Sequence, residues 1–305
     1  MDDPADTHCP SAGPSVRACA AVAMLAIATA GACRGGDRDA LLHIVQDQCL
    51  PHWRAQQDPA PCTRVMGRDF ALLKDRKGGA HYLLIATATV RGIEDPVLTD
   101  AEAPNYFGAA WQARDRLEAV MGMPIADDAV GLAVNSAIAR GQDQLHIHIE
   151  CLGQRMRRLL QTDADRIGER WAPLPGSTEP FLARRIPGRS LDGVNPFQLL
   201  AREVPGARRH MGDYTLVLAA VGFKDGPGFV LLTGRTASGA AALLPAHGGL
   251  VPPGETLLDS TCEAARTQVQ LPSSPPEEPP PSSQPPASLM PKSGPPRSGF
   301  GSGGG

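Results

Sequence analysis

The segment GQDQLHIHIEC, residues 141–151, places two histidines at alternate positions among apolar residues. In an extended strand, residues i and i+2 point to the same face, so His146 and His148 share a face, with Gln144 before them. The leucine and isoleucines between them share the opposite face, which packs into a core. A strand of this kind holds two imidazoles rigidly, and catalysis requires such fixed geometry.

An imidazole near its ordinary pKa can act as a nucleophile, a base, an acid or a metal ligand. A metal site needs a third ligand. His81, His210, His247 or the acidic segment 94–100 could supply it, although no characteristic sequence spacing links any of them to the histidine pair. In phosphoryl chemistry one histidine attacks phosphorus and the second assists at a phosphate oxygen. Two half-buried structural histidines fit the pattern equally well, so the pattern alone leaves these alternatives open.

The residues before the histidine strand suit a phosphorylated ligand. Asn135, Arg140 and Gln142 supply amide and cationic groups that bind phosphate and sugar oxygens. The net charge of −3 gives no basic footprint for nucleic acid, so nucleic acid is not an expected partner.

The surrounding pattern predicts an α+β fold, an antiparallel sheet with flanking helices. Turn sequences separate the first two and the last two of six apolar or β-branched segments, which predicts two hairpins. The predicted strands are 70–74, 82–90, 130–135, 145–151, 213–221 and 228–233, and the predicted helices are 40–48, 105–121, 152–170 and 197–203.

Both ends of the chain differ from this middle part. The uncharged run 18–32 would span about 22 Å as a helix, short of a bilayer core of about 30 Å, so 1–33 is predicted to be a signal or anchor segment. Lipidation of Cys33 and a buried N-terminal helix are alternatives. Residues 271–305 are rich in Pro, Ser and Gly and are predicted to be a disordered tail. The predicted folded domain is therefore 34–270.

Four cysteines remain in that domain, and an even number in an exported domain indicates two disulfides. Cys49 and Cys62 flank a proline-rich loop, which favours their pairing and leaves Cys151 for Cys262. Four cysteines allow three pairings, and four buried thiols are a further alternative.

Several longer stretches support a family assignment. They include CLPHWRAQQDPAPC, LLKDRKGGAHYLLIATATV, AVNSAIARGQDQLHIHIEC and NPFQLLAREVPGARRHMGDYTLVL, within residues 41–233. This region resembles the histidine-triad superfamily and, within it, the bacterial CDP-diacylglycerol pyrophosphatase family. The resemblance implies a histidine-triad-like fold that hydrolyses the membrane lipid CDP-diacylglycerol to CMP and phosphatidate. It implies no metal or other cofactor, and a domain tethered to the bacterial inner membrane and facing the periplasm.

The same resemblance implies roles for single residues. His146 falls on the nucleophile, which would carry a nucleotidyl intermediate, and His148 on the histidine that contacts phosphate. Asn135 and Gln142 would hold phosphate or ribose. Lys74 would neutralise charge, although a solvated turn lysine is an equal alternative.

Gln144 stands where the first histidine of the triad belongs. A glutamine at this substrate-binding position can form hydrogen bonds but cannot carry a proton. Activity survives if this position only orients its neighbours and falls if it titrates. Two other functions therefore stay open: a broader nucleotidyl hydrolase or transferase for soluble nucleotides, and a non-catalytic exported protein that binds a nucleotide or lipid headgroup.

Overall fold

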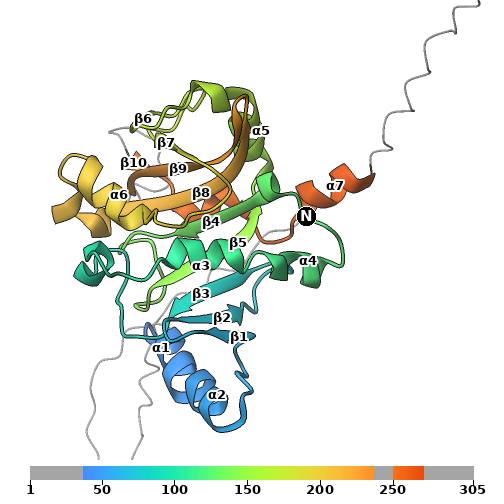
Figure 1. Cartoon of the computed structure of the whole chain (residues 1–305), viewed down its shortest axis with the longest axis vertical. Coiled ribbons are helices and arrows are strands. Elements are labelled where there is room, and N and C mark those ends of the chain that lie inside the picture. The colour runs from blue at the N-terminus through green and yellow to red at the C-terminus, as the bar shows by residue number, and fades with distance from the viewer. Residues whose placement is uncertain (1–36, 237–249, 271–305) are drawn as a thin grey trace, which may run out of the picture. The chain divides into compact units, whose positions relative to one another are not determined.

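The histidine strand belongs to one large sheet. Its strands lie side by side in the order β1-β2-β3-β5-β4-β8-β9-β7-β6 (Figure 1). The computed structural model describes residues 37–236 and 250–270, and those from Arg38 onward belong to one structural unit. Strands β10 and β11 pair with β9 and β5, and every described pairing is antiparallel except β10 with β9. The predicted α+β architecture is confirmed.

The strands are Arg64–Met66 (β1), Phe70–Lys74 (β2), Tyr82–Ala86 (β3), Val130–Val134 (β4), His146–Leu152 (β5), Ala172–Pro173 (β6), Leu182–Pro187 (β7), Tyr214–Phe223 (β8), Gly226–Thr236 (β9), Leu250–Val251 (β10) and Leu258–Asp259 (β11). The helices are Ala40–His43 (α1), Leu50–Gln56 (α2), Tyr106–Gln112 (α3), Asp115–Met121 (α4), Gln154–Asp163 (α5), Pro196–Glu203 (α6) and Glu263–Gln270 (α7). Among the described helices, none is long and apolar enough to cross a membrane.

The structure corrects several predicted boundaries. The first helix continues to Gln56 through a π-helical segment, Ile44–Cys49, and Pro51 lies in the first turn of α2, directly after that segment. The predicted helix 105–121 is split into α3 and α4, and the predicted helix 152–170 ends at Asp163. Sequence analysis missed β1, β6, β7, β10 and β11, of which all but β7 are two or three residues long. The predicted signal segment 1–33 and tail 271–305 lie outside the described residues.

One face of the sheet carries a large, continuous apolar cluster. Ile147 and Ile149 of β5 pack there with Leu84 and Leu132 of the neighbouring strands. Helices α3, α4 and α6 contribute to the same cluster, with α3 and α4 in contact with β5. This cluster buries the apolar side of the histidine strand, as the alternating pattern predicts.

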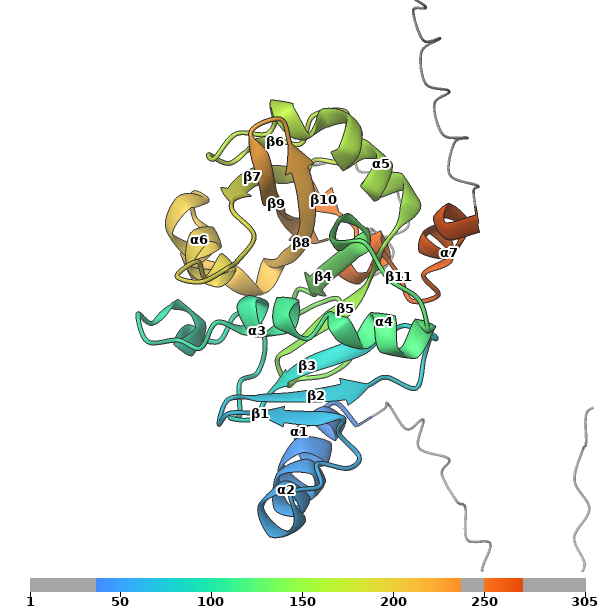
Figure 2. The ribbon, with the colours of Figure 1, turned by 45° about the vertical axis from the view of Figure 1, so that its right-hand side comes forward.

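The opposite face carries two separate apolar clusters. Near one end of the sheet, α1 and the π-helical segment pack over Ala71, Leu83 and Ile85. Near the other, α5 packs over Ala133, Val217 and other residues of β8 and β9. Figure 2 shows α2 below β1 and β2, and α5 beside the long β8–β9 hairpin.

Strand β5 lies between these two clusters. His148 pairs with Leu83 on one side and with Ala133 on the other, and directly paired residues share a face of the sheet. His146, His148 and Glu150 therefore form a polar strip with an apolar cluster on each side. All three groups are buried.

Residues 250–262 are here called the closing segment. They return to the sheet and lie next to this polar strip. β10 lies beside β9, a 3₁₀ turn follows at Gly254–Leu257, and β11 pairs with the end of β5. Gly254 is required here, because a Cβ at this position would lie 2.4 Å from Thr215 Oγ1. The disulfides Cys49–Cys62 and Cys151–Cys262 both form, so the predicted pairing is confirmed. The second one ties the closing segment to β5.

The two disulfides should differ in their contribution to stability. They close loops with sequence separations of 13 and 111 residues. The chain-entropy model predicts a loss of about 5 kcal/mol for Cys151→Ala/Cys262→Ala and about 3 kcal/mol for Cys49→Ala/Cys62→Ala. Urea unfolding of the two double variants under non-reducing conditions measures both losses. Equal losses, or the reverse order, would show that the closing segment is held chiefly by its non-covalent contacts.

Candidate active site

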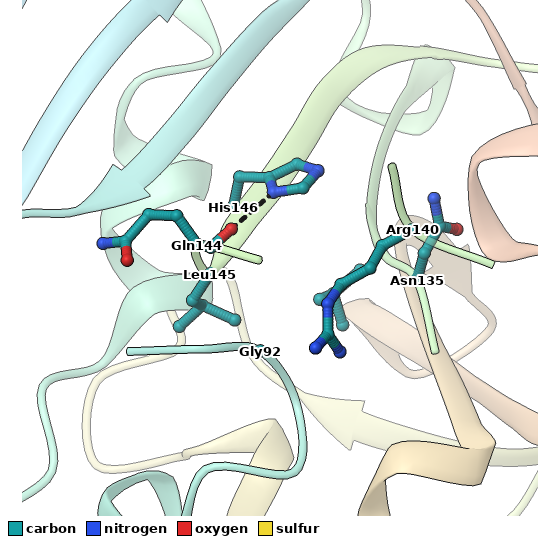
Figure 3. A pocket seen from close by; sticks show the side chains of 7 residues that line it. Gly92, Asn135, Arg140, Gln144, Leu145 and His146 are labelled. Atoms are coloured by element: carbon teal, nitrogen blue, oxygen red, sulfur yellow. Dashed lines mark hydrogen bonds between the residues drawn. The ribbon is translucent and has the colours of Figure 1, made fainter. Parts of the chain in front are cut away.

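His146 is held as a neutral imidazole with one nitrogen available. Its Nδ1 lies 2.7 Å from the backbone oxygen of Gln144 (Figure 3), and a carbonyl oxygen can only accept. Nδ1 therefore carries the proton, and Nε2 keeps its lone pair. Burial lowers the pKa of His146 to about 4, and the neighbouring His148 acts in the same direction. At neutral pH this side chain can act as a nucleophile through Nε2.

Gln144 fixes the backbone that orients His146. Its amide nitrogen donates to the backbone oxygens of Ala86 at 2.6 Å and Ala88 at 2.7 Å, and its amide oxygen accepts from Val90 N at 3.3 Å. The side chain is fully buried and points away from the imidazole (Figure 3). These bonds hold the chain beyond Ala86 in a loop, which explains why β3 ends earlier than predicted.

Asn135 and Arg140 lie on the other side of the site. Asn135 follows β4 directly, is buried, and accepts a hydrogen bond from Glu255 N at 3.2 Å. The Arg140 guanidinium donates to both carboxylate oxygens of Glu94 and to Asp143. The positive charge of Arg140 is thus balanced by two acidic residues.

These groups surround a small hollow, drawn in Figure 3. It is lined by Gly92, Val134, Asn135, Arg140, Gln144, Leu145 and His146. Its free volume for a molecule the size of water is about 0 Å³ in this structure. A substrate group can therefore enter only if the lining residues move apart.

Gln142 and Lys74 lie outside this lining. Gln142 accepts a hydrogen bond from Leu41 N at the start of α1. Lys74 donates from Nζ to the backbone oxygens of Asp75 and Gly78, in the turn after β2. The structure thus brings Asn135, Gln144 and His146 together at the hollow, while the roles of Gln142 and Lys74 in substrate binding stay predictions.

His148 belongs to a buried cluster beside the hollow. Its Nδ1 lies 3.0 Å from His81 Nε2 and 3.7 Å from Glu150 Oε1. Glu150 Oε1 is also 3.1 Å from His81 Nε2. The other nitrogen of His148, Nε2, lies 3.2 Å from Glu255 Oε2 in the closing segment.

Burial dominates the electrostatics of this cluster. It raises the pKa of Glu150 to about 7, against an opposing contribution from His81. It also lowers the pKa of His81 and of His148. These pKa shifts favour the uncharged forms of all three side chains, because transfer of an ionised group from water to a protein interior is costly.

Sequence analysis missed Glu150 and Glu255, and it named His81 only as one of several candidate third metal ligands. Glu150 follows His148 by two positions, so the alternation itself could have placed it on the same face. His81 could be placed only with the register between β3 and β5. Glu255 lies in the closing segment, and no local pattern connects that segment with β5. Of the other suggested metal ligands, His247 lies outside the described residues.

The low pKa of His146 should make stability depend on pH. Between about pH 6.5 and pH 4 the unfolded chain binds a proton on this imidazole and the folded protein does not, so the free energy of unfolding falls as pH is lowered. The expected loss from pH 7 to pH 4.5 is about 2 kcal/mol. Urea unfolding at both pH values should show this loss in the wild type and its absence in His146→Gln. His43→Gln, which alters an exposed histidine of α1, should behave like the wild type. An unchanged pH dependence in His146→Gln would contradict the assignment.

The chain matches the model of one protein family over most of its length. A family model described as CDP-diacylglycerol pyrophosphatase matches residues 36–266. The match extends beyond residue 233, where the stretches recognised in the sequence end, and takes in the closing segment. It therefore contains every residue of the hollow and of the histidine cluster.

Proposed function

Because the chain belongs to the CDP-diacylglycerol pyrophosphatase family, we propose that it acts through a covalent intermediate on His146. The enzyme hydrolyses the pyrophosphate bond of CDP-diacylglycerol and releases CMP and phosphatidate. The hydrogen bond between His146 Nδ1 and the Gln144 backbone oxygen carries the proposal, because it leaves Nε2 unprotonated beside the hollow.

In the first step, Nε2 of His146 attacks the phosphorus on the cytidine side. A P–N bond forms, and the bond from that phosphorus to the bridging oxygen breaks. Phosphatidate leaves with the electron pair of that bond. The ring in the cytidylyl-histidine intermediate bears positive charge, which the Gln144 carbonyl stabilises through Nδ1–H. Water then attacks phosphorus and loses a proton to the solvent, the P–N bond breaks with its electron pair returning to the imidazole, and CMP leaves.

His148 and Asn135 are proposed to bind the reacting phosphate. Nε2 of His148 faces the carboxylate of Glu255, and the backbone N–H of Glu255 is bonded to Asn135. An anionic phosphate would repel the Glu255 carboxylate and take over its place beside His148. The amide of Asn135 would then contact a phosphate or ribose oxygen. The histidine-triad superfamily is proposed as the wider relationship, with the QLHIH pattern on β5 as its support.

Removal of the nucleophile gives the direct test. His146→Ala should lower kcat for CMP release from CDP-diacylglycerol by at least about 10³-fold, because the covalent route is lost. Wild-type enzyme quenched with denaturant at alkaline pH, where the P–N bond survives, should carry a CMP adduct that mass spectrometry of peptides assigns to His146. His43→Ala should retain wild-type activity. Substantial hydrolysis by His146→Ala, or an adduct on another residue, would refute the covalent role of His146.

The Gln144→His variant tests whether the side chain at position 144 only orients its neighbours or also transfers a proton. An imidazole cannot reproduce two donated bonds and one accepted bond, so a buried carbonyl would lose its partner at a cost of about 1–3 kcal/mol. We expect lower stability in urea and no gain in kcat. A kcat raised by tenfold or more would instead mean that a histidine at this position takes part in proton transfer.

We further propose that the enzyme is bacterial, is tethered to the inner membrane and faces the periplasm. The two disulfides fit an oxidising compartment, and the apolar run 18–32 fits an exported or anchored chain. A broader activity on soluble nucleotides has no comparable support. In a bacterial host, thiol blocking and non-reducing electrophoresis should find both disulfides in the full chain and free thiols after deletion of 1–33. Equal oxidation of the two forms would reject export through this segment.

A further inference from the structure

Three potential metal ligands converge beside the proposed nucleophile. His81 lies directly before β3, and His148 and Glu150 lie on β5. His81 Nε2, His148 Nδ1 and Glu150 Oε1 all lie within 4.8 Å of one another, and all three residues are buried. We infer that His81, His148 and Glu150 bind one divalent metal ion of the zinc class.

The separations of the three atoms match those around a tetrahedral zinc ion. They are 3.0 Å, 3.1 Å and 3.7 Å. Ligands at bond lengths of about 2.0–2.1 Å in tetrahedral geometry lie about 3.3–3.4 Å apart. The circle through the three atoms has a radius just below that bond length, so one ion can reach all of them with little movement of the side chains.

Hydrogen bonds among these three atoms satisfy them less well than a bound divalent cation would. His81 Nε2 lies close to both His148 Nδ1 and Glu150 Oε1, yet this nitrogen can carry only one hydrogen. The third pair, His148 Nδ1 and Glu150 Oε1, is too far apart for a hydrogen bond. A divalent cation would satisfy all three lone pairs and neutralise the buried carboxylate.

The outer nitrogens of both histidines lie near carboxylates. His148 Nε2 lies 3.2 Å from Glu255 Oε2, and His81 Nδ1 lies 3.9 Å from Asp75 Oδ2, beyond hydrogen-bond distance. Metal-binding histidines commonly present their outer N–H to a carboxylate, which orients the ring and raises its basicity. Both rings here have a carboxylate on the side away from the cluster.

The ligand types select the class of metal. Two imidazole nitrogens and one carboxylate oxygen suit Zn²⁺, whereas Mg²⁺ and Ca²⁺ prefer sites built from oxygen. With a metal on Nδ1, the neutral ring of His148 carries its proton on Nε2. If the proposed function holds, this fixes His148 as a hydrogen-bond donor to the substrate phosphate.

The test uses the full-length chain, purified in detergent and stripped with a chelator. Titration with ZnCl₂ by calorimetry should give one Zn²⁺ per chain. Glu150→Gln and His81→Gln should each weaken the affinity by at least about tenfold, the lower range seen even for outer-shell changes. His43→Ala removes an exposed pair with Asp47, 3.1 Å apart in α1 and the segment after it, and should bind Zn²⁺ like the wild type.

Three results would overturn the inference: no binding by the wild type, unchanged binding in both cluster variants, or loss of binding in His43→Ala. Circular dichroism checks that the variants fold. Should they not fold, the wild type with one equivalent of Co²⁺ replaces them, and the absence of the visible bands of a tetrahedral Co²⁺ site rejects the site. His146→Ala should still bind Zn²⁺ while releasing no CMP, so failure of the metal site and failure of the covalent mechanism remain distinguishable.

Discussion

The hydrogen bond from His146 Nδ1 to the Gln144 backbone oxygen is the interaction on which the proposed chemistry depends. It fixes the tautomer, and burial keeps the ring neutral. The position of that oxygen depends in turn on the Gln144 side chain, which is bonded to backbone groups of Ala86, at the end of β3, and of Ala88 and Val90 in the loop that follows. Gln144 therefore meets a geometric requirement without carrying a proton.

A second constraint is the placement of β5 in the sheet. Its isoleucines fill a continuous core, whereas its histidines face a gap between two apolar clusters. The flanking clusters reduce the contact of His146 and His148 with water. The resulting low dielectric disfavours charged imidazoles and strengthens every remaining polar contact in the strip. The same burial that keeps His146 neutral makes Glu150 costly to ionise unless a cation lies beside it.

Local pattern accounts for the parts of this site that lie within one segment. The alternation in QLHIHIE placed both histidines on one face, and the turn sequences located both hairpins, because these features depend on nearest neighbours. The position of His81 depends on the register of β3 against β5, and that of Glu255 on the path of the closing segment. Neither leaves a periodic signal. The short strand β11 forms because of its neighbour β5, and its own two residues show no strand pattern.

The disulfide between Cys151 and Cys262 connects the histidine strand β5 with the closing segment. Cys151 follows Glu150 on β5, and Cys262 ends the closing segment that carries Glu255. The bond therefore limits how far Glu255 can move from His148. The same covalent link that closes a loop of 111 residues keeps the carboxylate of Glu255 beside the imidazole of His148.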